Sequence, residues 1–244
     1  MKMPTTRALT LWLLACAAAL AISGCKSVPG RPGVEVARPE DVLDFATLYG
    51  QNCAACHGEK GRNGPAISLA NPEYLAVAGA ANIQRVTANG VPGTAMPPFG
   101  RAAGGMLTDR QIEALARGMI SAWGNVSSIV GQTPPAYASS ANGNLAQGEK
   151  VFATFCAQCH GADATGANAN GVATGSLVEP SYLALISDQG LRSMILAGQT
   201  EHGTHNWRSY VSGRPMTDQE IADVVTWMAS HRIATPGQVY KQHP

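Results

Sequence analysis

Hydrophobic residues recur at helical spacing in two segments that begin with the same Thr-Asp pair, at Thr108 and at Thr217. A Gln or a Glu stands three residues after each Thr, which is the pattern of a capping box at a helix start. The apolar positions that follow predict two amphipathic helices, each with one buried face. These positions are Ile112, Leu115, Ala116 and Met119 in the first segment, and Ile221, Val224, Val225 and Met228 in the second.

Further pairs of matching segments extend this repeat over most of the chain. Residues 69–76 read LANPEYLA, and residues 177–184 read LVEPSYLA. A stretch that contains Pro and Ser, residues 131–143, separates the two copies and predicts a linker. The repeat therefore predicts two helical, loop-rich domains at residues 41–130 and 144–235, followed by a tail at residues 236–244.

The composition changes this picture in two ways. A hydrophobic share of 45% excludes a disordered chain, but 4 Trp, 6 Tyr and 4 Phe beside 27 Gly and 15 Pro are a thin supply for two cores. We therefore expect a cofactor to fill part of each core. The net charge of +1 comes without a clustered basic face, so nucleic acid is not an expected partner.

The N-terminus predicts a targeting segment. Lys2 and Arg7 precede a largely apolar run from Ala8 to Ile22. This run suits a signal peptide at residues 1–24 and is shorter than the ~20 residues that a membrane-spanning helix needs. The sequence ISGC, which ends at Cys25, resembles the lipobox of bacterial lipoproteins, in which the Cys carries the lipid. Cleavage nearby with a free Cys25 is the alternative.

Residues 25–40 would then act as a Pro- and Gly-rich tether. This interpretation predicts an exported protein that is anchored by lipid at the periplasmic face. Lys26, directly after the Cys, slightly favours the outer membrane.

The four remaining cysteines outside this segment fall into two identical motifs, Cys53-Ala-Ala-Cys56-His57 and Cys156-Ala-Gln-Cys159-His160. Two disulfides would explain neither histidine nor the repeated spacing. Cys-x-x-Cys-His is typical of c-type haem attachment, in which both thiols form thioethers and the imidazole binds the iron. The sequence therefore predicts two covalently bound haem c groups.

With these motifs and the closing helices, each half resembles a class I cytochrome c domain, and the chain resembles a tandem dihaem cytochrome c. The resemblance implies an all-α fold in which haem supplies most of each core. It also implies that a Met downstream of the motif completes the iron coordination. Met96 in GTAMPPF matches that loop, and Gly64-Pro65 matches a turn whose carbonyl accepts the ring N–H of His57. Met106 and Met119 are expected in the core.

The second half departs from the family pattern, because no Met stands in the corresponding loop, EHGTHNWR. Counting back from the Thr-Asp helix start places His205 opposite Met96. Aligning Trp207 with Phe99 places Thr204 there instead, with His205 one residue along. We take His205 as the first candidate for the sixth ligand, and His202, a Met from elsewhere or an open site as alternatives. Met194 and Met216 are expected to pack in the core.

The loop after His160 is also longer than its counterpart, through residues 162–170, and it leaves the carbonyl that would orient His160 unassigned. This insertion predicts a mobile surface loop, or else a segment that shapes a haem edge for a partner.

The resemblance implies an electron carrier rather than an enzyme. It would transfer electrons from a quinol-oxidising donor to a terminal oxidase or reductase, between respiratory or photosynthetic membrane complexes. It would do so as a tethered carrier or as a subunit of such a complex. A haem peroxidase or reductase that uses an open second haem is the alternative, although no distal acid or base can be identified. Because lysines are few, docking is expected to rest on an apolar patch or on permanent association.

Overall fold

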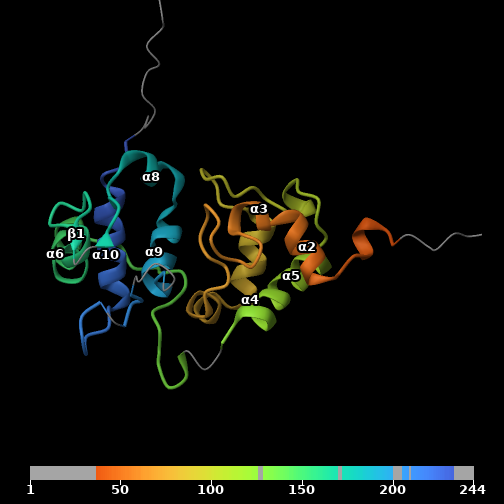
Figure 1. The fold of residues 1–244 in the computed structure, drawn as a ribbon, viewed down its shortest axis with the longest axis horizontal. Helices are drawn as coiled ribbons and strands as arrows, with labels where there is room; N and C mark the ends of the chain where they lie inside the picture. Colours follow the sequence, from red (N-terminus) through yellow and green to blue (C-terminus); the bar gives the residue numbers. More distant parts are fainter. Residues whose placement is uncertain (1–36, 126–128, 170–171, 200–204, 209, 234–244) are drawn as a thin grey trace, which may run out of the picture. The chain divides into compact units, whose positions relative to one another are not determined.

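The computed structural model describes residues 37–125, 129–169, 172–199, 205–208 and 210–233 (Figure 1). The chain divides into two compact units, Met1–Pro39 and Glu40–Pro244, and nearly all described residues belong to the second. The predicted signal peptide, Cys25, His202 and the tail at residues 236–244 lie outside the described residues. In the described part of the chain, no helix is both long enough and apolar enough to cross a membrane.

The first repeat is built from helices. In chain order these are η1 (Pro39–Asp41), α2 (Phe45–Asn52), α3 (Ala54–His57), α4 (Pro72–Asn89), η2 (Arg101–Ala103) and α5 (Asp109–Trp123). Helix α5 packs against both α2 and α4.

The second repeat follows the same order. Its elements are α6 (Leu145–Phe155), α7 (Ala157–His160), β1 (Asn168–Ala169), β2 (Val172–Ala173), α8 (Pro180–Leu185), α9 (Asp188–Ala197) and α10 (Asp218–Ala229). Helix α10 packs along α6 and against α9 (Figure 1). The predicted all-α fold is confirmed, apart from the two-residue strands β1 and β2. They pair antiparallel in the loop between His160 and α8, partly beyond the predicted insertion.

Both predicted helix starts carry complete capping boxes. The Thr108 hydroxyl accepts the Gln111 amide, and the Gln111 side chain accepts the Thr108 amide in return. Thr217 and Glu220 do the same at α10. Two exposed helix N-terminal amides are satisfied in each case, which explains why α5 and α10 begin at equivalent positions.

A kink marks the same position in both repeats. Gly79 interrupts α4 with φ 65° and ψ 166°, a conformation that favours glycine. Eight residues separate Gly79 from the cap Asn71, and eight residues also separate Ser187 from the cap Glu179. At Ser187 the second repeat ends one helix and begins another, because the Ser187 hydroxyl accepts the Gly190 amide.

The crossing of the first and last helices of each repeat needs one glycine. A Cβ on Gly118 of α5 would lie 2.2 Å from the Phe45 ring of α2. In the second repeat the glycine is on the other helix, since a Cβ on Gly148 of α6 would lie 2.6 Å from the Trp227 Cβ of α10. In the first repeat the aromatic residue at the crossing is on the first helix, α2, and the glycine is on the last helix, α5. In the second repeat the aromatic residue is on the last helix, α10, and the glycine is on the first helix, α6.

Two buried clusters form the cores, and they include most of the predicted residues. Met119, Met216 and Met228 are each less than 5% exposed. The expectation for Met106 was wrong, because it is 80% exposed. The Leu107 amide donates to the Phe99 carbonyl, and Leu107 is the residue that turns inward, so its neighbour Met106 faces solvent.

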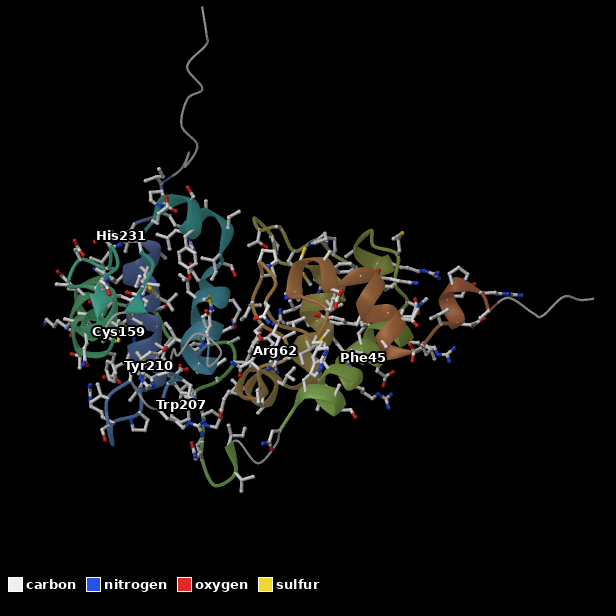
Figure 2. The ribbon with its side chains drawn as sticks, in the orientation of Figure 1. Phe45, Arg62, Cys159, Trp207, Tyr210 and His231 are labelled. Carbon is white, nitrogen blue, oxygen red and sulfur yellow. The ribbon has the colours of Figure 1, made fainter. Side chains whose placement is uncertain are left out.

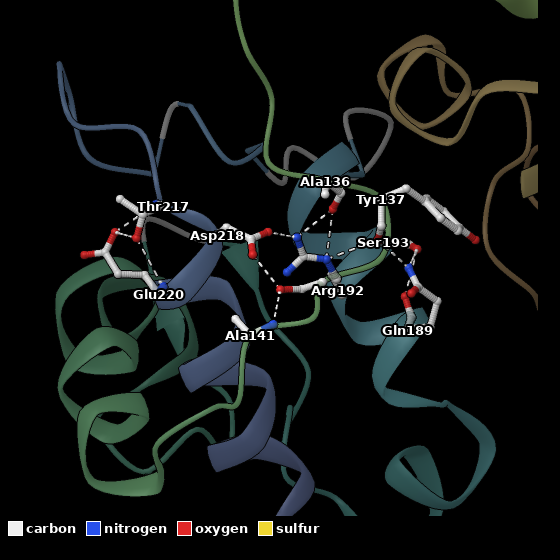
Figure 3. Close-up of polar contacts among 10 residues, drawn as sticks. Ala136, Tyr137, Ala141, Gln189, Arg192, Ser193, Thr217, Asp218 and Glu220 are labelled. Atoms are coloured by element: carbon white, nitrogen blue, oxygen red, sulfur yellow. Dashed lines mark hydrogen bonds and ion pairs between the residues drawn. The ribbon is translucent and has the colours of Figure 1, made fainter.

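The predicted linker is ordered where it contacts the second repeat (Figure 3). The Arg192 guanidinium, on α9, donates to the carbonyls of Ala136 and Tyr137 and pairs with Asp218 at the start of α10. The Tyr137 side chain is only 7% exposed, and its ring lies edge-on to Tyr74 of α4. This segment therefore contributes to the core of the unit rather than only connecting two domains.

Candidate functional site

The first Cys-x-x-Cys-His motif forms a single tight helical turn. Cys53 ends α2, and the amides of Cys56 and His57 both donate to the Cys53 carbonyl, at 3.2 and 3.0 Å. Gly58 follows with a φ of 82°, which reverses the chain, and the Tyr49 hydroxyl donates to the Gly58 carbonyl at 2.8 Å. One turn of helix therefore carries both thiols and the imidazole.

The second motif repeats this backbone closely. The φ and ψ angles are −121° and −33° at Cys156, against −120° and −33° at Cys53. The amides of Cys159 and His160 donate to the Cys156 carbonyl, and Gly161 has a φ of 79°. The two motifs thus hold their thiols and imidazoles on the same scaffold.

The His57 side chain is buried, and its ring is oriented by the backbone. Its Nδ1 lies 2.7 Å from the Ile67 carbonyl oxygen. Burial lowers the pKa of His57, although the hydrogen bond to Ile67 acts in the opposite direction. A neutral imidazole whose Nδ1 proton is engaged keeps the Nε2 lone pair for a metal.

The acceptor differs from the expected Gly64-Pro65 turn. Gly64 has another role, since a Cβ there would lie 2.3 Å from the Cys56 carbonyl oxygen. Glycine lets this turn pack directly against the Cys-x-x-Cys-His turn, and the chain then presents the Ile67 carbonyl two residues after Pro65.

The structure supplies the orienting carbonyl that the sequence left unassigned for His160. The Nδ1 of His160 lies 3.3 Å from the Gly175 carbonyl oxygen, and the Thr174 hydroxyl donates to the Cys159 carbonyl. Ile67 and Gly175 precede the matching residues Leu69 and Leu177 by the same two positions. Once one acceptor is known, the alignment of the two repeats gives the other, because both stand two positions before the matching leucines. Neither could be identified from its side chain, since each acts through its backbone carbonyl.

The first thiol of each motif lacks the lowered pKa of a reactive redox cysteine. Burial, with a smaller contribution from the neighbouring Cys, raises the pKa of Cys53 to about 11 and that of Cys156 to about 12. Dithiols that exchange with disulfides have a lowered thiol pKa. None of the four motif cysteines forms a disulfide with another described residue. Two thiols followed directly by a histidine on one helical turn, in each repeat, fit the covalent attachment of haem c.

Met96 lies half-buried in the loop that follows α4. The Val91 amide donates to the Met96 carbonyl at 3.0 Å, and the Met96 amide donates to the Thr94 hydroxyl at 3.2 Å. A Cβ on Gly90 would lie 2.6 Å from Pro97 and Pro98 backbone atoms, so the loop folds back on the end of α4. These contacts hold the backbone of Met96 in a defined turn.

The structure decides between the two alignments of the corresponding loop in the second repeat. The Met216 amide donates to the Trp207 carbonyl, as the Leu107 amide does to Phe99. Gly198 ends α9 nine residues before Trp207, and Gly90 ends α4 nine residues before Phe99. Trp207 therefore corresponds to Phe99, and the extra residue lies between Trp207 and Met216. Counting from the helix start was wrong by one position, and Thr204 corresponds to Met96.

His205 is exposed, and its ring centroid lies 6.3 Å from that of Tyr210. Tyr210 packs against the core of the second repeat and is drawn near Trp207 in Figure 2. Burial raises the pKa of Tyr210, and the nearby Cys156 raises it further. Tyr210 and Cys156 both pack against the core of the second repeat.

The methionines of the second repeat are engaged elsewhere. Met216 and Met228 are core residues, as expected. Met194 is partly buried on α9, and the Tyr182 hydroxyl donates to its sulfur at 3.6 Å.

Both halves of the chain match models of haem-binding families. Residues 40–117 match cytochrome c oxidase, cbb3-type, subunit III, and residues 145–232 match cytochrome c. Two curated relatives are subunits of cbb3-type cytochrome c oxidases. CcoP of Azospirillum sp. (strain B510) is 30% identical over 154 residues, which are 57% of this chain and 47% of the relative. FixP of Sinorhizobium medicae (strain WSM419) is 32% identical over 130 residues, which are 50% of this chain and 39% of the relative.

The chain thus spans less than half the length of these curated relatives. Among solved structures, the Kuenenia stuttgartiensis reducing HAO-like protein complex Kustc0457/Kustc0458 aligns with 81% of this chain and 100% of its own. The identity is 15% and the TM-score 0.45. A likeness at this level carries no argument about function.

Proposed function

We propose that this chain, which consists of two cytochrome c-type domains in tandem and binds two haem c groups, transfers electrons in a membrane respiratory or photosynthetic chain. It would act at the periplasmic face, as a subunit of an oxidase complex or as a tethered carrier. The similarity to two cbb3-type oxidase subunits supports this proposal most directly. The same similarity does not favour the alternative, a haem peroxidase or reductase. Bound haem supplies a reversible one-electron change of iron valence, and the chain's residues set where and at what potential that change occurs.

For the first haem we propose His57 and Met96 as the axial ligands. The Ile67 carbonyl holds the imidazole ring, and the turn between Val91 and Met96 holds the backbone that carries the thioether. A thioether favours ferrous iron, so this pair predicts a high reduction potential.

For the second haem we propose His160 and His205. His205 is one position from the residue that corresponds to Met96, and its ring lies against Tyr210, which is close to Cys156. No methionine of the second repeat among the described residues lies in this loop. Two imidazole ligands would give this haem a lower potential than the first.

A spectroscopic measurement of the oxidised dihaem protein tests the ligands. We expect a sulfur-to-iron charge-transfer band equivalent to one haem, together with one low-spin bis-imidazole electron paramagnetic resonance signal. The substitution His205→Ala should abolish only the bis-imidazole signal, whereas His231→Ala, whose ring packs against Trp227, should change neither signal. A sulfur band equivalent to two haems would contradict the assignment of His205.

Electron transfer itself is tested with membranes of the source organism that contain the chain's own oxidase. Reduced protein should be reoxidised by these membranes under oxygen, and a specific inhibitor of the terminal oxidase should stop the reaction. Rapid carbon monoxide binding by half of the haem, together with peroxide turnover, would support a peroxidase instead.

The chain is also proposed to be exported and anchored through a lipid on Cys25. A lipid anchor would confine the protein near membrane complexes. A single acyl chain would bind the membrane only weakly, so stable anchoring needs more than one. Substitution Cys25→Ala should release the protein from washed membranes. Retention of the Ala variant would show that another segment or a partner holds it there. Separating the two membranes would test the slight preference for the outer membrane.

A further inference from the structure

One arginine joins the first repeat, the linker and the segment that carries His205. Arg208 donates to Glu73 on α4 at 2.5 Å and to Gln132 of the linker at 2.8 Å. Its Nε donates to the Asn206 side-chain oxygen, which also accepts the Arg208 amide at 3.1 Å. The guanidinium therefore holds the side chain of Asn206, the residue that directly follows His205.

The ion pair is sheltered from water. The Arg208 and Glu73 side chains are 21% and 12% exposed, and the Oε2 of Glu73 is buried with no partner among the described residues. A carboxylate in that position depends on its charged partner, because an unpaired buried charge is strongly unfavourable. Glu73 also lies in the first turn of α4, where the helix dipole favours a negative charge.

The same turn of α4 holds the end of α9. Asn71 caps α4 by accepting the Tyr74 amide, and its Nδ2 donates to the carbonyls of Gly198, at 2.9 Å, and Ala197, at 3.3 Å. The last carbonyls of a helix have no partner within it. The first repeat supplies a partner for two of these at α9, and Asn71 is only 3% exposed.

Asn71 and Glu73 thus contact the second repeat on both sides of its candidate ligand loop, at Gly198 and at Arg208. We propose that they are positioning residues for the second haem, which hold His205 as the sixth ligand of its iron. Glu73 acts through Arg208 and Asn206, and Asn71 acts by holding the chain at Gly198. This inference rests on the ligation by His205 proposed above. It makes the coordination of one haem depend on the domain that carries the other.

The test uses the full dihaem protein with the substitutions Glu73→Gln and Arg208→Gln. Carbon monoxide needs a vacant iron position, so its binding to the reduced protein reports loss of the sixth ligand. We expect binding to the second haem to become about tenfold faster in each variant, a factor that corresponds to ~1.4 kcal/mol. The sulfur-to-iron band of the first haem should stay unchanged.

The matched controls are Glu113→Gln and Arg117→Gln, which remove an ion pair on the exposed surface of α5. Exposed pairs contribute little to stability, and this pair is distant in sequence from the His205 segment. Arg208→Lys should give an intermediate rate, because Lys can pair with Glu73 but lacks the planar group that also reaches Gln132 and Asn206.

Two results would overturn the inference. In one, both variants unfold at lower denaturant concentration but bind carbon monoxide at the wild-type rate, so the pair only stabilises the fold. In the other, the wild-type second haem already binds carbon monoxide as fast as the variants, so His205 is not held on the iron. Reoxidation by membranes is measured separately, so either result leaves the proposed electron-transfer function to its own test.

Discussion

At the scale of the residue, the two proximal histidines differ in how firmly the backbone holds them. The distance from Nδ1 to the accepting carbonyl is 2.7 Å for His57 and 3.3 Å for His160, and only His57 is fully buried. A stronger hydrogen bond at Nδ1 makes the other ring nitrogen a better electron donor. The two proposed iron sites would therefore differ on their proximal sides as well as in the sixth ligand.

Replacement of Met96 by Ala should change the first haem alone. Loss of the thioether should remove the sulfur-to-iron band and lower the potential of that haem, because the thioether favours ferrous iron. The control is Met106→Ala, since Met106 is 80% exposed and should leave spectrum and potential unchanged. A redox titration with optical detection measures both variants. An unchanged band in the Met96 variant would show that another residue binds the iron.

At the scale of the element, the helix crossing of each repeat is specified by one aromatic residue and one glycine. Phe45 faces Gly118 in the first repeat, and Gly148 faces Trp227 in the second. In each repeat the two helices can approach closely only because one of them has a glycine, with no side chain, at the point of contact. Helix propensity would favour Ala at either position, so the close approach of the two helices is the reason for glycine there.

Substitution Gly148→Ala should destabilise the second repeat by ~1–3 kcal/mol, the usual effect of overfilling a packed contact. The new Cβ would lie 2.2 Å from the Asp223 carbonyl oxygen, and backbone cannot move away cheaply. The control is Gly50→Ala on α2, where no atom lies within 4 Å of the new Cβ. There we expect up to ~1 kcal/mol of stabilisation from helix propensity. Urea unfolding measures both, and a neutral Gly148→Ala would contradict the close contact.

At the scale of the whole molecule, the linker is part of the packed structure. Arg192 holds the Ala136 and Tyr137 carbonyls and pairs with Asp218, which also accepts the Ser139 hydroxyl (Figure 3). The side chain of Arg192 is 6% exposed and that of Asp218 is 40% exposed. This network connects α9, α10 and the segment between the repeats.

The contribution of Asp218 should depend on pH. Burial raises the pKa of Asp218, but hydrogen bonds from Ser139 and Arg192 outweigh it and hold the pKa below its ordinary value of 3.8. A lowered folded-state pKa stabilises the fold above the ordinary value, and this stabilisation is lost as pH falls through the folded value. Asp218→Asn should therefore lower the free energy of unfolding by ~1–2 kcal/mol at neutral pH, after allowance for exposure.

Urea unfolding at neutral pH and at ~pH 2 would check this, because the two proteins should become equally stable once the carboxyl is protonated. The control is Asp109→Asn, which alters the same first position of α5. An equal loss in the control would assign the effect to the helix dipole instead of the linker network.

Electron transfer to the partner complex should depend only weakly on ionic strength. After loss of the signal peptide the chain has four lysines, Lys26, Lys60, Lys150 and Lys241. Charge steering needs a concentrated patch of one sign, and its effect on the association rate falls steeply with salt. Stopped-flow oxidation over a range of salt concentrations measures this dependence. A steep decrease in rate would indicate docking by charge.

The sequence by itself determined the features that depend on neighbouring residues. The two Cys-x-x-Cys-His turns, the capping boxes at Thr108 and Thr217 and the repeated fold follow from local spacing, because one helical turn defines their geometry. The comparisons confirm the tandem cytochrome c-type domains and their two haem c groups. The domain boundaries and the axial ligands remain predictions.

Only the tertiary structure decided which groups meet from distant parts of the chain. It replaced the expected Gly64-Pro65 acceptor by the Ile67 carbonyl, aligned Thr204 rather than His205 with Met96, and exposed Met106. It also paired Glu73 with Arg208, which are 135 residues apart. A residue that acts through its backbone carbonyl has no side-chain pattern that would identify it. The position of the extra residue in the second repeat depends on which backbone groups form hydrogen bonds, as Met216 and Trp207 do. Such contacts are set by packing, and spacing along the chain cannot specify them.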